Sequence, residues 1–141
     1  MTDYDPQNIF GKILRGEIPS VKVYEDETVL VMMDAFPQSR GHILVLPKSA
    51  SRNLLDADPG ELALVAAYLP KLARAVKDAT GADGIRLMQS NEAPAGQTVF
   101  HLHFHLIPVY DGQAIGHHAA GGQADTNELN ALAELIAAKL V

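Results

Sequence analysis

The sequence of 141 residues contains no cysteine. This absence excludes a disulfide framework and any chemistry that depends on a thiolate. The sequence also lacks a cluster of lysine or arginine, and its formal net charge is −6. A protein that binds a nucleic-acid backbone needs a basic surface. We therefore expect no nucleic-acid partner, whereas a small phosphorylated ligand, which needs only local hydrogen-bond donors, is compatible with this charge.

Long hydrophobic runs are absent as well. No segment approaches the roughly 18 consecutive apolar residues of a membrane span. The first six residues, MTDYDP, have neither the basic start nor the apolar core of a signal peptide. These features predict a cytoplasmic protein with no membrane partner. The hydrophobic content of 48% and the chain length predict one hydrophobic core that buries roughly two thirds of the unfolded surface.

Three of the six histidines lie within five residues, in the run HLHFHL at 101–106. They alternate with apolar residues, and a period of two is the period of a β-strand. We therefore predict a strand in which His101, His103 and His105 share one face, each roughly 6.6–7 Å from the next. The apolar residues between them should face a core.

Such a row of histidines has three possible roles. It can bind a metal, supply a nucleophile and an acid for transfer of an anionic group, or consist of ordinary polar strand residues. The strict spacing makes the last role uncommon. Just before the row, Gly96 lets the backbone approach a ligand closely, and Gln97 and Thr98 add an amide and a hydroxyl. Small and polar residues here favour a phosphate over a metal, which would need another strong ligand.

Alternation and turn residues predict four further strands. The first two, at 21–24 and 28–33, are joined by the acidic turn 25–27 and form a hairpin. The third, at 42–47, is mostly apolar and so should be buried on both faces. The fourth, at 85–90, enters the polar loop directly before the histidine row.

Capping residues predict two helices in the first part of the chain. Asn8 is an N-cap for a short helix that ends near Gly16. Asp58 begins a long helix that Gly81 should end, and Pro70 should kink it because proline removes a helical hydrogen bond. This long helix should lie across the sheet as scaffold.

The C-terminal part of the chain changes in composition. Residues 112–124 are rich in glycine, alanine and histidine and are predicted to form a flexible loop. Within it, His117 and His118 are expected to be a surface pair rather than metal ligands. A final helix is predicted over 125–140, with an apolar stripe that packs either on its own domain or on a partner subunit.

Three polar residues next to predicted strands are further candidates for a site. Asp34 ends the second strand and could hold a ribose diol, although capping of a loop is the commoner role for such a residue. His42 opens the third strand, and its local sequence leaves a functional and a structural role equally open. Asn91 lies in the loop before the histidine row, which brings it to the same end of the sheet as the histidines, as an anion site requires.

The histidine row and the segments around it resemble the signature of the histidine triad (HIT) superfamily of nucleotidyl hydrolases and transferases. The match covers about residues 8 to 109, and the segment NIFGKILRGEIP at 8–19 is similar to the opening of the Hint-type branch. The resemblance implies an α+β fold, with an antiparallel sheet of about five strands, one long helix, one short helix and a C-terminal helix. It also implies a HIT domain over 1–112, with the loop and helix of 113–141 appended to it, and a homodimer.

The resemblance implies roles for individual residues as well. His103 would be the nucleophile and His105 would donate to the phosphate, while His42 and His101 would complete the catalytic wall. The positions implied for nucleotide and phosphate binding are Asp34, Asn91, Gly96, Gln97 and Thr98. The implied reaction is hydrolysis of the P–N bond of a purine nucleoside phosphoramidate through a nucleotidyl-histidine intermediate, with no cofactor.

One departure from the family pattern concerns zinc. Many bacterial relatives bind structural zinc through a Cys-x-x-Cys pair near the start, a His after the Pro-Lys segment and one His of the row. This sequence has Asn8 and Gly11 at the paired positions and Ala50 at the third. Because a tetrahedral zinc site needs four ligands, we predict that no structural zinc is bound.

Three alternatives remain open at this point. The three histidines could hold a catalytic metal, which predicts loss of activity on chelation, although the sequence offers no obvious fourth ligand. The same scaffold could hydrolyse dinucleoside polyphosphates or transfer nucleotides, with a different leaving group. The protein could also be a nucleotide-binding interaction protein, which would bind AMP and turn over no substrate analogue.

Overall fold

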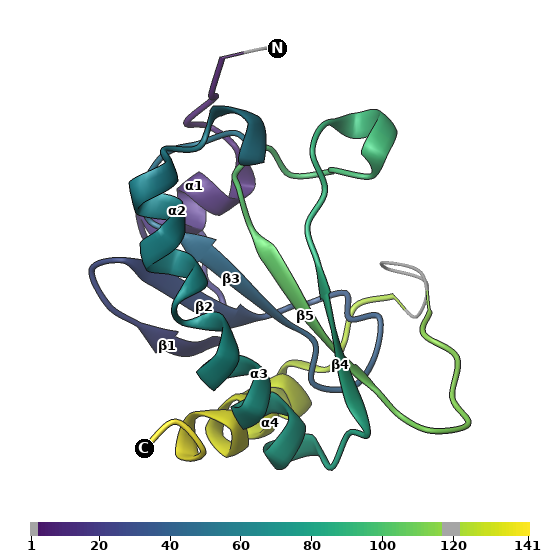
Figure 1. Cartoon of the computed structure of the whole chain (residues 1–141). Coiled ribbons are helices and arrows are strands. Elements are labelled where there is room, and N and C mark those ends of the chain that lie inside the picture. Colours follow the sequence, from purple (N-terminus) through teal and green to yellow (C-terminus); the bar gives the residue numbers. More distant parts are fainter. Residues whose placement is uncertain (1–2, 117–121) are drawn as a thin grey trace.

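A computed structural model describes residues 3–116 and 122–141 of the chain. Its centre is a five-stranded sheet in the order β1-β2-β3-β5-β4, in which every neighbouring pair is antiparallel (Figure 1). The strands are β1 Lys22–Glu25, β2 Val29–Met33, β3 Ile43–Pro47, β4 Gly84–Met88 and β5 Phe104–Val109. The α+β fold and the five strands predicted from the sequence are confirmed.

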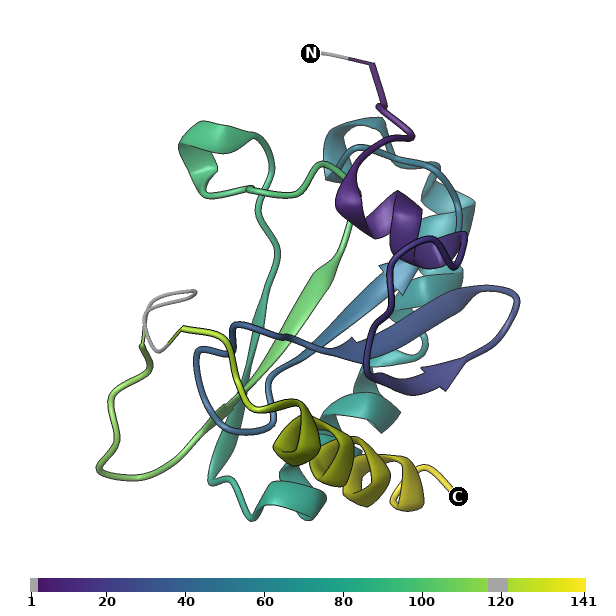
Figure 2. The ribbon, with the colours of Figure 1, turned by 180° about the vertical axis from the view of Figure 1, so that it is seen from behind.

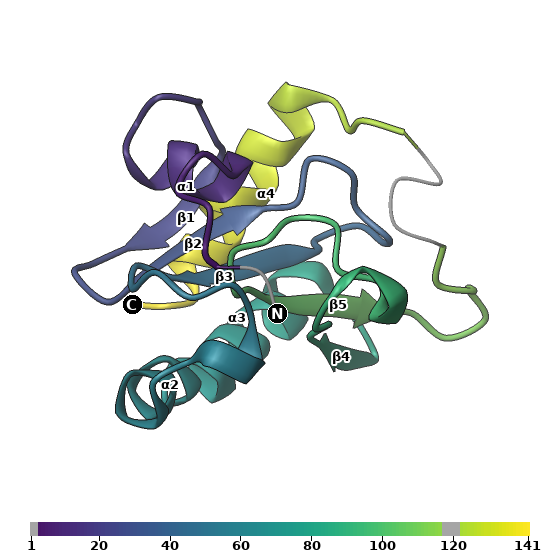
Figure 3. The same cartoon turned by 90° about the horizontal axis from the view of Figure 1, so that it is seen from above.

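Helices cover both faces of this sheet. The α-helices are α1 Ile9–Leu14, α2 Pro59–Ala66, α3 Leu69–Thr80 and α4 Thr126–Ala138, and two short 3₁₀ helices are η1 Leu54–Asp56 and η2 Ala93–Ala95. Figure 3 shows α1 on one side of the sheet and α2 and α3 on the other. In the view of Figure 2, α1 lies on one side of the β1–β2 hairpin and α4 on the other.

Alternation along the strands divides the apolar residues between two cores. In β2, Val29, Val31 and Met33 join the main core with α2, α3 and α4. The residues between them, Leu30 and Met32, pack with α1 on the opposite face. Since side chains of a strand point alternately to its two faces, the all-apolar sequence of β2 follows from burial on both sides.

The predicted histidine strand is shorter than the sequence pattern suggests. Strand β5 begins at Phe104, and the ladder between β3 and β5 starts with the pair Val45 and Phe104. Beyond this pair, the Pro47 carbonyl accepts a hydrogen bond from the His101 side chain, and the Leu102 N–H donates to the carbonyl of Ser51. His101 and His103 therefore precede the strand, in a segment whose backbone groups are used elsewhere.

The predicted apolar face of the row is confirmed. Leu102, Phe104 and Leu106 are all buried in the main core. His103 and His105 lie on the other side of the chain, together with Phe10 of α1. Burial of the alternating apolar residues thus orients the histidines away from the main core.

The long helix predicted from Asp58 to Gly81 is present as two helices with a bend. The Asp58 side chain accepts a hydrogen bond from the Glu61 N–H and caps α2, and Gly81 ends α3 with φ of +71°. The break falls at Ala67 and Tyr68, because Pro70 at the second position of α3 has no N–H for the preceding turn. Pro70 therefore interrupts the long helix and bends it, as the sequence predicts.

Helix α4 packs on its own domain, which is one of the two positions left open by the sequence. Leu129, Leu132 and Ile136 are buried in the main core, and Asp125 caps the helix through the Glu128 N–H. The division of the chain at residue 112 stays a prediction. The predicted surface pair His117 and His118 lies outside the described residues.

The described helices are all short compared with a membrane span. The longest, α4, has 13 residues, and none of the helices in the described ranges is both long and apolar enough to cross a membrane.

Gly41, which directly precedes His42, gives a test of the packing between β3 and α3. Its φ is +94°, and a Cβ would lie 2.5 Å from Cγ2 of Thr80. We predict that Gly41→Ala lowers the free energy of unfolding by about 1–3 kcal/mol, because it combines backbone strain with a steric clash. The measurement is denaturant unfolding. The matched control is Gly84→Ala, since a Cβ there meets no atom within 4 Å, and equal stabilities of the two variants would contradict the prediction.

Candidate active site

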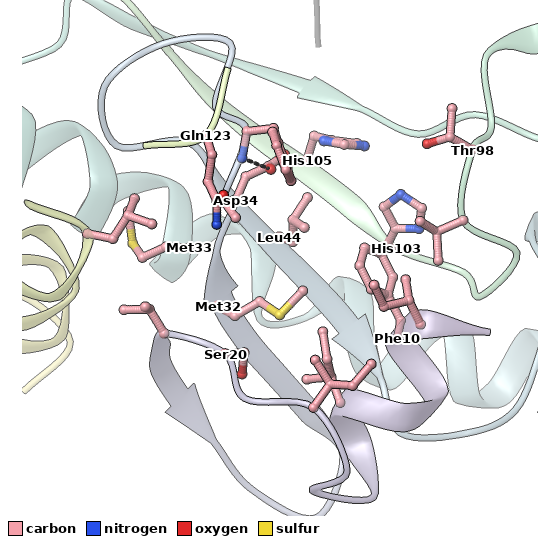
Figure 4. Close-up of a pocket in the computed structure, with 18 of the residues that line it drawn as sticks. Phe10, Ser20, Met32, Met33, Asp34, Leu44, Thr98, His103, His105 and Gln123 are labelled. Carbon is pink, nitrogen blue, oxygen red and sulfur yellow. Dashed lines mark hydrogen bonds between the residues drawn. The ribbon is translucent and has the colours of Figure 1, made fainter. Parts of the chain in front are cut away.

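A cavity of about 720 Å³ opens on the face of the sheet that α1 covers. Its walls come from α1, the ends of β2 and β5, the loop before β5 and the first turns of α4 (Figure 4). This volume falls within the range typical of small-molecule sites. Of the nine residues proposed from the sequence, those that line the cavity are Asp34, Gly96, Gln97, Thr98, His103 and His105.

His103 is held by the backbone just before β5. Its Nδ1 lies 2.6 Å from the carbonyl oxygen of His101. Because a carbonyl can only accept, Nδ1 carries the proton and the lone pair of the neutral ring is on Nε2. The ring also makes edge contacts with Phe10 and His105, with centroid distances of 4.9 and 5.0 Å. His103 therefore presents a basic nitrogen in a fixed orientation at the cavity wall.

His42 and His105 form a hydrogen-bonded pair, and their tautomers differ from that of His103. His42 is fully buried, and its Nδ1 accepts a hydrogen bond of 3.0 Å from the Gln38 N–H. The proton of the neutral ring is therefore on Nε2, which lies 2.9 Å from His105 Nδ1 and donates to it. His105 then carries its own proton on Nε2. One histidine of the cavity thus offers an acceptor, and the other offers a donor.

Asp34 lies beside this pair. Its Oδ1 accepts a hydrogen bond of 2.8 Å from the Phe36 N–H, and its Oδ2 is 3.4 Å from His42 Nε2. A carboxylate at this distance stabilises positive charge that develops on the two coupled rings. Asp34 also lines the cavity, and its contact with a ribose stays a prediction.

His101 is buried behind His103 and does not line the cavity. Its Nε2 donates to the Pro47 carbonyl at 2.7 Å, and its Nδ1 accepts from the Tyr4 hydroxyl at 2.7 Å. Burial lowers the pKa of the His101 imidazole, and the neighbouring His103 lowers it further. His101 is thus a neutral ring that fixes the segment whose carbonyl orients His103.

Two of the proposed phosphate residues use their side chains within the protein. Gln97 donates to the carbonyls of Arg52 and Val99 and accepts from the Glu92 N–H. Asn91 lies outside the cavity wall, where its Oδ1 accepts a hydrogen bond from the Leu54 N–H. Their contacts with a phosphate stay predictions, whereas the contacts described here hold the loop before β5 in shape.

Gly96 and Thr98 stand on this loop at the cavity wall. Gly96 has φ of +101°, which favours glycine. Thr98 lies at the same end of the cavity as His103, with its side chain directed toward the cavity (Figure 4). A hydroxyl here can donate to a phosphate oxygen that His103 approaches.

A cluster that the sequence analysis missed supports the same loop. Arg52 donates two hydrogen bonds to the Glu92 carboxylate, at 2.8 and 3.1 Å, and the buried Asn53 amide donates to Glu92 and to Gln97. The Arg52 guanidinium holds the pKa of the Glu92 carboxyl below its ordinary value. Glu92 has φ of +73°, the only positive value among the described non-glycine residues, so the cluster stabilises a strained turn.

One group of side chains brings three potential metal ligands together. Within the part of the chain that the structure describes, ligand atoms of Asp34, His42 and His105 lie within 4.8 Å of one another. Two nitrogens bound to one tetrahedral zinc at 2.0–2.1 Å would be about 3.3 Å apart, whereas His42 Nε2 and His105 Nδ1 are 2.9 Å apart. This shorter separation, and the proton that lies between the rings, fit a hydrogen bond better than a shared ion.

Two of the positions at which the family resemblance implies zinc ligands, Asn8 and Gly11, are joined by a protein contact. The Asn8 side chain accepts a hydrogen bond of 2.8 Å from the Gly11 N–H as the cap of α1. Neither residue has a thiolate or imidazole to offer a metal. The absence of structural zinc stays a prediction, which the chemistry of these two positions supports.

The fold and the cavity together define a class: an α+β protein with oriented histidines in a pocket suited to a small phosphorylated ligand. The model of the HIT domain matches residues 15–112, and the chain belongs to the HIT family. The structure of a HIT-like protein involved in cell-cycle regulation from Bartonella henselae, with an unknown ligand, is 50% identical in sequence. It superimposes with a TM-score of 0.89, covering 96% of this chain and 98% of that one.

Two further relatives bear on the ligand. A hypothetical histidine triad nucleotide-binding protein from Sulfolobus tokodaii is 33% identical and superimposes with a TM-score of 0.83, covering 92% of this chain and 89% of that one. Adenylylsulfatase HINT3 of Arabidopsis thaliana is 41% identical over 100 residues, which are 71% of this chain. The match spans only 51% of the length of HINT3.

The burial of His101 gives a pH-dependent stability that can be tested. Its pKa is lower in the folded protein than in the unfolded chain, where it is about 6.5, so the unfolded chain binds the proton more strongly. We therefore predict that the free energy of unfolding falls as the pH is lowered from 7.5 to 5, and that this slope is smaller in His101→Gln. Carboxylates titrate mainly below this window. Denaturant unfolding at each pH measures the slopes, and equal slopes would contradict the assignment.

Proposed function

We propose that this protein is a nucleotide-binding hydrolase that cleaves purine nucleoside phosphoramidates at the P–N bond through a nucleotidyl-His103 intermediate. The observation that supports it most strongly is the hydrogen bond from His103 Nδ1 to the His101 carbonyl. In the neutral ring it holds the proton on Nδ1 and leaves the lone pair on Nε2, at the wall of a cavity that His105 also lines. A neutral imidazole with a defined lone pair is the nucleophile that an anionic phosphorus centre requires.

In the first step, His103 Nε2 attacks phosphorus. A bond from phosphorus to His103 forms while the bond to the amine breaks, and the amine takes up a proton from the solvent as it leaves. His105 donates its Nε2–H to a phosphoryl oxygen, and Thr98 donates its hydroxyl to another. Donors fixed in advance around these oxygens stabilise the charge of the transition state.

In the second step, water attacks the phosphorus of the intermediate and breaks its bond to His103. The products are the nucleoside monophosphate and the restored imidazole. The water releases one proton to the solvent, which replaces the proton that the amine took up in the first step. The Asp34 carboxylate, 3.4 Å from His42, stabilises the His42–His105 pair as the donor to the phosphoryl oxygens. The net reaction is the addition of water across the P–N bond.

The charge of the cavity lining favours a ligand with one phosphate and a neutral nucleoside. Among its described lining residues there is neither lysine nor arginine, and the ionisable groups are Asp34, His103 and His105. A chain of several phosphates carries charges that these residues cannot balance. This composition favours a nucleoside monophosphate derivative over a dinucleoside polyphosphate as the substrate.

We also propose that the chain acts as a homodimer. Strand β4 lies at the edge of the sheet and pairs only with β5 among the described strands. Leu87 of β4 is 54% exposed. An exposed edge strand with an apolar side chain can pair with a second chain.

The catalytic role of His103 gives the central test. We predict that His103→Ala lowers kcat/KM for adenosine 5′-phosphoramidate by roughly 10³-fold or more, because it removes the nucleophile. Wild-type protein, quenched during turnover of substrate labelled in the adenosine, should carry AMP on His103, as peptide mass analysis would show. The matched control Asn127→Ala, on the exposed side of α4, should behave as wild type. Full turnover by His103→Ala would overturn the proposal.

The leaving group is tested by comparing substrates. The relationship to HINT3, an adenylylsulfatase, makes adenylyl sulfate a second candidate, since attack on the same phosphorus would release sulfate instead of an amine. Rates on adenosine 5′-phosphoramidate, adenylyl sulfate and a diadenosine polyphosphate should be measured side by side. The fastest of the three identifies the substrate class, and AMP binding without turnover of any would favour a binding role.

Metal removal separates this mechanism from metal-dependent hydrolysis. We predict that dialysis against EDTA leaves kcat/KM unchanged, because His103 and His105 carry the chemistry as neutral rings. The measurement is the hydrolysis rate before and after chelation, with added zinc as the second arm. Loss of activity on chelation, restored by zinc, would instead assign Asp34, His42 and His105 as ligands.

A further inference from the structure

The chain before α1 reaches the histidine segment. The hydroxyl of Tyr4 lies 2.7 Å from Nδ1 of His101, and the two rings meet edge to face with their centroids 5.6 Å apart. The HIT domain match begins at residue 15, so Tyr4 precedes it. A residue outside the matched part of the chain therefore contacts the first histidine of the row.

Both ring nitrogens of His101 are engaged, and the direction of each hydrogen bond is fixed. The Pro47 carbonyl, 2.7 Å from Nε2, can only accept, so Nε2 of the neutral ring carries the proton. Nδ1 then has the lone pair, and the Tyr4 hydroxyl donates to it. His101 is only 1% exposed, so the solvent offers no substitute for this donor. An acceptor left unpaired in the interior is costly, and without the hydroxyl the ring would have to turn or move.

Side-chain contacts hold the backbone at His101 in place of a ladder. His101 and His103 precede β5 and lie outside its ladders with β3 and β4. The segment is held instead by the ring of His101 and by the Leu102 N–H, which donates to the Ser51 carbonyl at 2.9 Å. The His101 carbonyl accepts from His103 Nδ1 at 2.6 Å. A displacement of the His101 ring therefore displaces the carbonyl that orients His103.

The segment that carries Tyr4 is itself joined to α1. The carbonyl of Asp5 accepts hydrogen bonds from the backbone and the side chain of Asn8, at 3.2 and 2.7 Å. Phe10 of α1 in turn packs its ring against His103 (Figure 4). The N-terminal segment and α1 together thus contact two histidines of the row.

We propose that Tyr4 is a positioning residue for the proposed nucleophile, His103. Its hydroxyl fixes the ring of His101, and the carbonyl of His101 fixes the ring of His103 with the lone pair on Nε2. The inference rests on the proposed function for the role of His103. It assigns to the N-terminal segment a part in catalysis that involves no contact with the substrate.

The first test changes only the hydroxyl. Tyr4→Phe keeps the ring and its edge contact, and the matched control is Tyr24→Phe, which removes a hydroxyl that bonds to Asp26 at 2.8 Å, away from the cavity wall. With adenosine 5′-phosphoramidate, we expect Tyr4→Phe to lower kcat by about 2- to 10-fold, as the loss of one neutral hydrogen bond predicts. KM should change by less than about 2-fold, because Tyr4 is not among the described residues that line the cavity. The control should match wild type, and an unchanged kcat in Tyr4→Phe would overturn the proposal.

A second measurement detects the positioning directly. Two-bond ¹H–¹⁵N correlation spectra of the labelled protein distinguish the tautomers of a neutral histidine ring. Wild type should show the proton on Nδ1 of His103 and on Nε2 of His101, whereas Tyr4→Phe should show a mixture of tautomers at both. Tyr24→Phe should give the wild-type spectrum. If Tyr4→Phe lowers only the thermal stability and leaves the tautomer of His103 unchanged, Tyr4 is merely structural and the proposal is wrong.

A double-mutant cycle tests the route through His101. In the background His101→Leu no ring nitrogen is present to accept from Tyr4, so adding Tyr4→Phe should lower kcat no further. An additive loss of kcat would show that Tyr4 acts by another route and would contradict the proposal. If His101→Leu does not fold, the tautomer of His103 in Tyr4→Phe decides.

Failure of this inference can be told apart from failure of the proposed function. If wild-type protein hydrolyses no phosphoramidate, the proposed reaction is wrong, and the spectra alone decide whether Tyr4 positions His103. If wild-type protein hydrolyses it and Tyr4→Phe matches wild type in kcat and in tautomer, only the role of Tyr4 is wrong.

Discussion

The hydrogen bond between His103 Nδ1 and the carbonyl of His101 is the interaction on which the proposed chemistry depends. A carbonyl within a β-ladder accepts from the backbone of the next strand. Because β5 starts only at Phe104, the carbonyl of His101 lies outside the ladder and accepts from a side chain instead. The early end of the ladder therefore allows the backbone to select the tautomer of His103. A buried, neutral His101, bonded to Tyr4 and Pro47, keeps this segment in position.

A backbone hydrogen bond also sets the tautomers of His42 and His105. The Gln38 N–H binds His42 Nδ1, and this single backbone contact fixes the direction of the hydrogen bond from His42 to His105. In their neutral forms, His103 thereby gives the cavity an acceptor and His105 gives it a donor. Side chains of the same type acquire different roles because different backbone groups face them, which sequence spacing alone does not reveal.

Local signals in the sequence predicted much of the fold, whereas contacts between distant residues were beyond them. The predicted caps Asn8 and Asp58 each mark a helix start correctly, since a cap depends only on residues within one turn. The pairing of Arg52 with Glu92 joins residues 40 positions apart, and no local pattern marks it. Gln97 shows the same limit. Its position next to the site was predicted, but its hydrogen bonds to Arg52 and Asn53 were not, because those residues are distant in the chain.

The cavity wall joins the histidine segment and the strand ends to the first turns of α4. Attack on phosphorus demands fixed geometry, and the histidines are accordingly held by strand ends and backbone hydrogen bonds. The first turns of α4 add uncharged side chains to the same cavity wall. Leu129 fixes this helix against the sheet through its burial in the main core, while Asn130, the next residue, remains exposed at the cavity. The helix therefore shapes the cavity without contributing to the hydrogen bonds that orient the histidines.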